Sequence, residues 1–114
     1  MKDDRPYLAD ILQALQRVEE IGQRGREAFF SDWLLQDAAI RNFEIVGEAV
    51  KRVSEELQGE HPEIPWADLA GFRDVLIHQY FRVDLKIVWA LIERRVAGLR
   101  GDVARLVAAL DKPG

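Results

Sequence analysis

The sequence has no cysteine, a single methionine and no long apolar run. Without cysteine the chain cannot form disulfides, bind a metal through thiolates or use a thiol nucleophile, and it fits a reducing compartment. No apolar stretch approaches the roughly 20 residues that cross a bilayer. The charged residues 1–5 precede no apolar segment of the kind found in secretory signals. We therefore expect a cytoplasmic protein without membrane contact.

A broad basic surface is also missing. The formal net charge is −4, from 20 acidic and 16 basic residues. This balance argues against a protein that coats nucleic acid through one large positive face. Four of the 16 basic residues are lysines, so the other 12 are arginines, whose forked guanidinium groups suit phosphate. We expect any contact with RNA to be local.

What the sequence does contain is helical periodicity. With 114 residues, 48% hydrophobic and 32% charged, the chain reads as one globular domain spanning 1–114. Apolar positions recur every three or four residues and strand-like alternation is absent, which predicts an all-α, up-and-down bundle of four to five helices. The predicted helices run from about Asp4 to Gly22, Ser31 to Leu57, Pro65 to His78 and from Val83 onward, the last bending or breaking near Gly98 or Gly101.

The second of these helices has the widest apolar face. Ser31 suits its N-cap, and two adjacent apolar stripes indicate two neighbours, for example its own bundle and a partner subunit. Gly47 in mid-helix costs about 1 kcal/mol relative to alanine, so we expect another helix to approach closely there. The three tryptophans, Trp33, Trp66 and Trp89, are interpreted as packing residues.

One segment, from Arg73 to Tyr80, holds the side chains that could cleave RNA without a metal. Arginine can hold a phosphate, and histidine can move a proton near neutral pH. Asp74 and His78 are an i, i+4 pair, so the carboxylate can orient the imidazole and favour its protonated form. Arg73 and His78 lie about 140° apart on a helical wheel, so one regular helix cannot aim both at one phosphate. Either the helix unwinds near His78 or a second copy completes the site; we favour the dimer.

Structural interpretations of the same residues stay open. Arg73 could cover the edge of the core with its aliphatic stem, and His78 could stabilise the negative end of its helix. Tyr80 falls on the core side of the wheel, so packing alone would explain it. His61, beside a proline in a predicted loop, is interpreted as a loop residue.

Metal chemistry is not expected. Glu44 and Glu48 form an i, i+4 carboxylate pair, but no Glu-x-x-His motif or second such helix completes a metal site. We interpret the pair as a solvated or arginine-paired stripe. No glycine-rich phosphate loop or serine-centred elbow is present, so the sequence predicts neither a metal nor a cofactor.

Several further motifs accompany the Arg73 segment in a fixed order. They are Ala39-x-Arg41 and Ile45-Val46-Gly47-Glu48-Ala49, then His61-Pro62-x-Ile64-Pro65-Trp66, then Gly71-x-Arg73-Asp74, His78-x-Tyr80, Val83-Asp84 and Val88-Trp89. Over nearly its whole length the chain thereby resembles the HepT-like family of HEPN-domain proteins, the toxin halves of toxin–antitoxin pairs. The resemblance implies a dimer with paired Arg-x4-His motifs lining a cleft between protomers.

The resemblance also implies an activity and a partner. The activity is metal-independent cleavage of RNA to a 2′,3′-cyclic phosphate and a 5′-hydroxyl, with Arg73 and His78 catalytic and Asp74 supporting. The partner is a nucleotidyltransferase of the MntA type, which silences the toxin by adenylylating the tyrosine that matches Tyr80. Two other functions remain open: a regulatory dimer that docks the nucleotidyltransferase with little RNase activity, and a purely structural dimer. The RNA target stays open as well.

Overall fold

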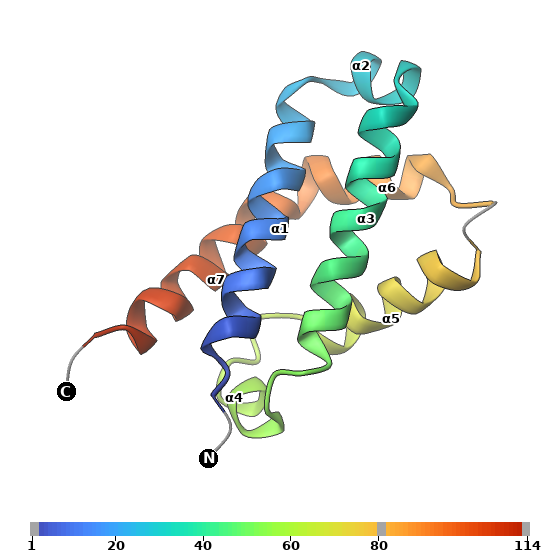
Figure 1. The fold of residues 1–114 in the computed structure, drawn as a ribbon. Helices are drawn as coiled ribbons and strands as arrows, with labels where there is room; N and C mark the ends of the chain where they lie inside the picture. Colours follow the sequence, from blue (N-terminus) through green and yellow to red (C-terminus); the bar gives the residue numbers. More distant parts are fainter. Residues whose placement is uncertain (1–2, 80–81, 113–114) are drawn as a thin grey trace.

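The computed structural model describes residues 3–79 and 82–112, and this part of the chain contains helices and no strands. Within these described residues, five helices of ten or more residues carry the fold, and two six-residue helices connect them (Figure 1). In chain order the helices are α1 (Arg5–Gln23), α2 (Arg26–Ser31), α3 (Trp33–Val50), α4 (Glu55–Glu60), α5 (Trp66–His78), α6 (Leu85–Arg94) and α7 (Val96–Leu110). The all-α prediction is confirmed, and the two short helices are additions to it.

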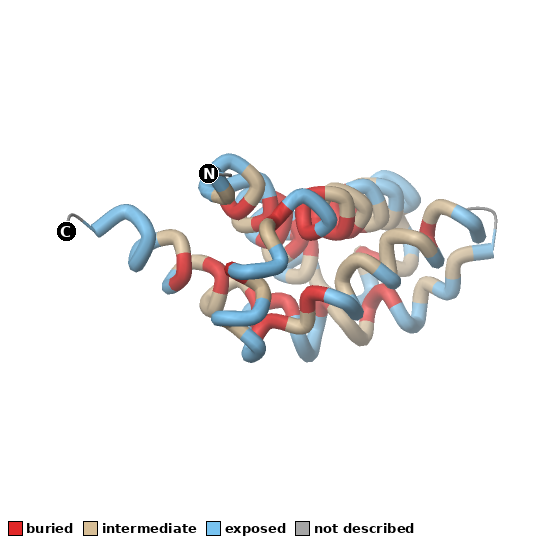
Figure 2. Tube along the Cα trace, turned by 90° about the horizontal axis from the view of Figure 1, so that it is seen from below, coloured by how far each residue is buried: buried red, intermediate tan, exposed pale blue. Residues whose placement is uncertain are grey.

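The centre of the molecule is the contact between α1 and α3, which lie side by side (Figure 1). α5 packs mainly on α3, and α7 packs mainly on α1. The buried positions face the space between these helices (Figure 2). Leu8, Ile11 and Leu15 of α1 are fully buried there, as the apolar stripe at helical spacing predicts. The site discussed below lies where α3 meets α5.

α3 begins one residue later than predicted. Ser31 is the last residue of α2, and Asp32 is the N-cap of α3. The Asp32 carboxylate accepts a hydrogen bond of 2.9 Å from the backbone N–H of Leu34, which satisfies one of the free donors at the start of the helix. The prediction of a Ser31 cap was therefore wrong, because a short helix occupies the preceding residues.

α3 also ends at Val50 rather than near Leu57. The side-chain amide of Gln58 donates hydrogen bonds of 3.1 Å to the carbonyls of both Val50 and Val53. These bonds satisfy carbonyls that a continuing helix would have paired with later N–H groups. Val53 and Leu57 are nevertheless buried, so the apolar pattern was right although the single long helix was wrong. α4 then occupies part of the predicted loop.

The last predicted helix is broken at a different residue from the one expected. α6 and α7 meet at Arg95, whereas Gly98 and Gly101 both lie inside α7. Trp66 and Trp89 are buried as predicted, but Trp33 is 66% exposed, so its interpretation as a packing residue within the protomer was wrong. Among residues 3–79 and 82–112, no helix is long and apolar enough to cross a membrane.

Candidate functional site

Gly47 sets how closely α5 approaches α3. A Cβ atom at this position would lie 2.1 Å from the Cβ of Arg73 and 2.8 Å from the carbonyl oxygen of Leu69. Both distances are far below van der Waals contact, so only glycine fits without moving a helix. The close helix approach predicted at Gly47 is confirmed, and the residue seated against the glycine is the candidate catalytic arginine.

The guanidinium of Arg73 is held by two carboxylates. One terminal nitrogen, Nη2, lies 3.2 Å from Oε2 of Glu48 on α3. The other, Nη1, lies 3.0 Å from Oδ1 of Asp74 on α5. Its Nε is buried and has no hydrogen-bond partner among the residues the structure describes. Arg73 is thus oriented by contacts from two helices while about a quarter of its side chain, 26%, stays exposed.

Two further cations extend this arrangement. Oε1 of Glu48 lies 3.7 Å from Nη2 of Arg52, and Oδ1 of Asp74 lies 2.6 Å from Nζ of Lys51. Charges therefore alternate along Arg52, Glu48, Arg73, Asp74 and Lys51, which we call the Arg73 network. The hydrogen bonds from Lys51 and then from Arg73 lower the pKa of Asp74 below its usual value. That carboxylate stays ionised near neutral pH.

His78 ends α5 and its side chain is exposed. Its Nδ1 lies 2.7 Å from the backbone carbonyl oxygen of Asp74. Because a carbonyl oxygen can only accept, Nδ1 carries a proton in this contact, and the neutral ring then has its free lone pair on Nε2. The predicted contact between the Asp74 carboxylate and the imidazole is not formed. That carboxylate pairs with Lys51 and Arg73 instead, so residue 74 orients His78 through its main chain.

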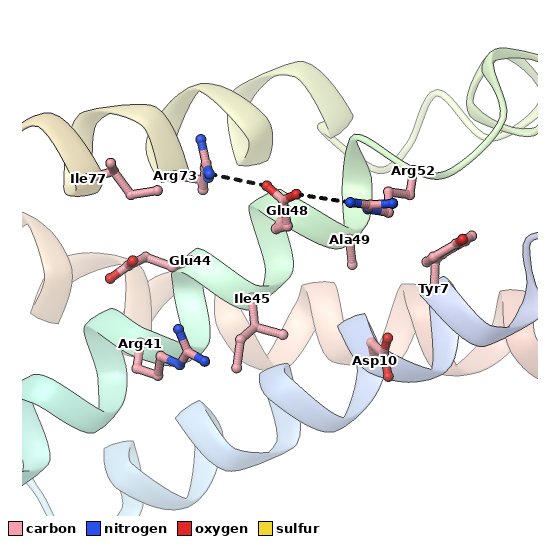
Figure 3. Close-up of a pocket in the computed structure, with 10 residues that line it drawn as sticks. All are labelled: Tyr7, Asp10, Arg41, Glu44, Ile45, Glu48, Ala49, Arg52, Arg73 and Ile77. Carbon is pink, nitrogen blue, oxygen red and sulfur yellow. Dashed lines mark ion pairs between the residues drawn. The ribbon is translucent and has the colours of Figure 1, made fainter.

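A surface groove of about 390 Å³ lies beside Arg73, between α1, α3 and α5. Figure 3 shows Glu48 between Arg73 and Arg52, with a dashed ion pair running from Glu48 to each of them. The lining residues include Arg41, Arg52 and Arg73, while His78 is not among them. Arg73 faces the groove and His78 lies outside it, in line with the angular separation that the helical wheel predicts.

The remaining predicted positions fall as follows. Tyr80 lies outside the described residues. His61 pairs with Glu63 at 3.3 Å, and its carbonyl accepts a hydrogen bond of 2.9 Å from the Trp66 indole, which fits a loop residue. No group of three or more histidine, aspartate or glutamate side chains that could hold a metal ion occurs in the described part of the chain.

The sequence interpretation missed the part that α3 plays. It left Glu48 as a solvated or arginine-paired residue without naming Arg73 as the partner. The available signal was Gly47, because a helical glycine that admits a neighbouring helix also brings the next side chain, Glu48, to that interface. Lys51 carried the same signal, since it follows Gly47 by four residues and shares its face on the predicted helix.

Comparison with known proteins points to one family. The family profile described as Ribonuclease HepT-like matches residues 11–106. A "Putative RNase" of Caldanaerobacter subterraneus subsp. tengcongensis is 39% identical over 108 residues, which cover 94% of this chain and 96% of the relative. A "Probable ribonuclease HepT" of Thermococcus cleftensis is 38% identical over 109 residues, covering 92% and 96% of the two chains.

A third relative is larger. The "Gamma-glutamylcyclotransferase and putative RNase" of Methanocaldococcus jannaschii is 37% identical over 112 residues, which cover 97% of this chain but only 50% of that protein. The chain thus spans half of this relative and nearly all of the two others. No solved structure matches the chain.

Proposed function

The chain belongs to the HepT-like ribonuclease family, and from its site we propose that it is a metal-independent endoribonuclease, the toxin of a toxin–antitoxin pair, acting as a homodimer. The observation that carries the proposal is the state of the two candidate side chains on α5. Arg73 is held at a groove by Glu48 and Asp74, and His78 has its Nδ1 proton committed to a carbonyl. A fixed cation and an available ring nitrogen are the two groups that this chemistry requires.

In the proposed reaction, Nε2 of His78 takes the proton of a ribose 2′-hydroxyl. The 2′-oxygen attacks the adjacent phosphorus, the bond to the 5′-oxygen breaks, and the products are a 2′,3′-cyclic phosphate and a 5′-hydroxyl. The leaving oxygen gains a proton from the imidazolium of a second His78 or from water. Arg73 stabilises the charge that grows on the non-bridging oxygens, and no step needs a metal.

The proposal places Arg73 of one protomer beside His78 of its partner. Within one chain the arginine lines the groove and the histidine does not, so a second copy offers a way to bring the groups together. Large apolar side chains are also exposed on the single chain, namely Trp33, Leu34, Val75, Ile87 and Leu110. Such residues are the type that subunit contacts cover.

The experiment is cleavage of a labelled single-stranded RNA by the purified protein in excess EDTA. Wild-type protein should cleave it and leave 2′,3′-cyclic phosphate ends, since neither Arg73 nor His78 needs a metal. Arg73→Ala and His78→Ala should each lose at least about 100-fold in rate, the usual contribution of a general base or a charge-stabilising group. Folded variants that cleave at the wild-type rate would exclude these roles.

Control by a nucleotidyltransferase of the MntA type completes the proposal. The tyrosine at 80 follows His78 by two residues in the sequence. A nucleotide joined to it would add bulk and a negative charge close to the catalytic histidine, and the negative charge would repel RNA. Intact-mass measurement after incubation with the partner and ATP should show one added AMP per chain. Tyr80→Phe should show none, and an unmodified wild-type chain would exclude this route.

A second candidate function is a regulatory dimer that docks the nucleotidyltransferase and has little RNase activity. Two observations favour it: the net charge of −4, which repels long RNA, and the pairing of both Arg73 terminal nitrogens with carboxylates. Partner binding by a wild-type dimer that leaves RNA intact would support this function over the first.

A further inference from the structure

The guanidinium of Arg73 lies beside two carboxylates that compete with an incoming phosphate. Each terminal nitrogen faces a carboxylate, and its Nε is buried. Because each terminal nitrogen carries two N–H groups, a phosphate can approach the guanidinium beside these carboxylates, but their negative charges oppose it, and its binding is strengthened when one of them moves away. These carboxylates differ in how firmly they are held, and the difference decides which one moves away more easily.

Asp74 is the more firmly held of the two. Its Oδ1 contacts Nζ of Lys51 at 2.6 Å as well as Arg73 at 3.0 Å, and it neighbours Arg73 on the same helix. Glu48 contacts Arg73 at the longer distance of 3.2 Å and from a different helix, whereas the two carboxylate side chains are about equally exposed, 47% for Glu48 and 46% for Asp74. Glu48 is the carboxylate that an incoming phosphate can displace at the lower cost.

A second cation, Arg52, lies close enough to pair with the carboxylate of Glu48 when it leaves Arg73. Nη2 of Arg52 lies 3.7 Å from Oε1 of Glu48, which is an ion pair but exceeds hydrogen-bond distance. Arg52 lies four residues beyond Glu48, and 60% of its side chain is exposed, so it can move. Closing this pair to hydrogen-bond distance would offset part of the loss of the contact with Arg73.

We propose that Glu48 is a positioning residue that holds Arg73 in the free enzyme and passes to Arg52 when an RNA phosphate binds Arg73. The inference rests on the proposed function, because it assigns a phosphate of RNA to Arg73. The exchange moves no proton and breaks no covalent bond. Its measurable consequence is that RNA binding is weakened by the charge of Glu48 and strengthened by Arg52, although Arg52 does not touch the RNA.

The first test is Glu48→Gln, which keeps the size of the side chain and removes its charge. KM for a mixed-sequence single-stranded RNA should fall about two- to five-fold, the range expected for a partly exposed ion pair, while kcat changes less. Glu20→Gln, an exposed substitution on α1 that also removes one negative charge, is the matched control and should leave KM unchanged.

The second test separates the exchange from direct RNA contact by Arg52. In the wild-type background, Arg52→Gln should raise KM about two- to five-fold, whereas Arg17→Gln, an exposed control on α1, should not. In the Glu48→Gln background the same Arg52 substitution should leave KM unchanged, because residue 48 then has no carboxylate with which Arg52 could pair. An equal rise in both backgrounds would make Arg52 an RNA ligand and overturn the inference.

The two proposals fail in different ways. A wild-type dimer that neither binds nor cleaves the RNA would remove the proposed function and this inference together. A wild-type enzyme that is active, with Glu48→Gln showing the same KM as Glu20→Gln, would remove only the role of Glu48.

Discussion

Gly47 and Arg73 touch across two helices, so a change at the glycine reaches the candidate catalytic arginine directly. The contact partners include the Leu69 carbonyl, which belongs to the main chain and cannot rotate away. A methyl group at residue 47 must therefore push α5 as a unit. At the scale of single residues, the missing side chain at Gly47 allows the Cβ of Arg73 to approach α3, while Glu48 and Asp74 orient the guanidinium.

Gly47→Ala should destabilise the protein by about 1–3 kcal/mol, the usual cost of overpacking, and should lower RNA cleavage because Arg73 moves. Chemical denaturation and a cleavage assay measure the two effects.

Gly98→Ala is the control for that substitution. Gly98 also lies inside a helix, but a Cβ there meets nothing within 4 Å. This variant should gain about 0.5–1 kcal/mol from helix propensity and keep full activity. Equal stability changes for the two glycines would show that the contact at Gly47 is not tight in solution.

At the scale of elements, the end of α3 is set by a side chain that comes eight residues after it. Gln58 donates to two carbonyls at this end, and Ser54 is held by the Asp4 carboxylate, which accepts bonds of 2.8 Å from its N–H and 2.6 Å from its hydroxyl. These contacts turn the chain into α4 and leave Glu48, Lys51 and Arg52 near the last turn of α3.

Gln58→Ala should cost about 1–2 kcal/mol, since two hydrogen bonds are lost and two carbonyls at a helix end lose a partner. Gln16→Ala, an exposed substitution on α1, is the control and should stay within about 0.5 kcal/mol of the wild type. Thermal or urea denaturation distinguishes them. A neutral Gln58→Ala would mean that water replaces the amide at no cost.

The same end of α3 shows what the sequence could and could not predict. Apolar spacing identified the buried face up to Leu57 and the bounds of α5, because burial repeats with the helical period. It could not identify the stop at Val50, which depends on the amide of Gln58 and on Asp4, about 50 residues away in the chain. The candidate site also contains residues that the sequence could identify and residues that it could not. Arg73 and His78 stood out by residue type, whereas Glu48 and Lys51 join the Arg73 network only when α3 and α5 pack.

At the scale of the whole molecule, the central question is whether one site takes its arginine and its histidine from different chains. The two variants Arg73→Ala and His78→Ala answer it when mixed. A mixed dimer holds one site with both groups intact if the groups come from different protomers, and none if they come from the same one.

After random exchange of subunits, half of the dimers are mixed and each has one working site of two, so about a quarter of the wild-type rate should return. Each variant carried through the same exchange alone is the control and should stay inactive. A mixture no more active than its components, with mixed dimers shown to form, would place both groups in one protomer and exclude the composite site.

Because the three tryptophans are unequally buried, their fluorescence can report separately on folding and on assembly. Trp66 and Trp89 sit in the core, so their emission reports folding, whereas Trp33 stands in water at the first turn of α3. Iodide should quench Trp33 selectively in a free chain. Loss of that quenching on assembly would show that a subunit or partner covers the start of α3. Quenching that persists would place the subunit and partner contacts elsewhere. Neither measurement needs an added label.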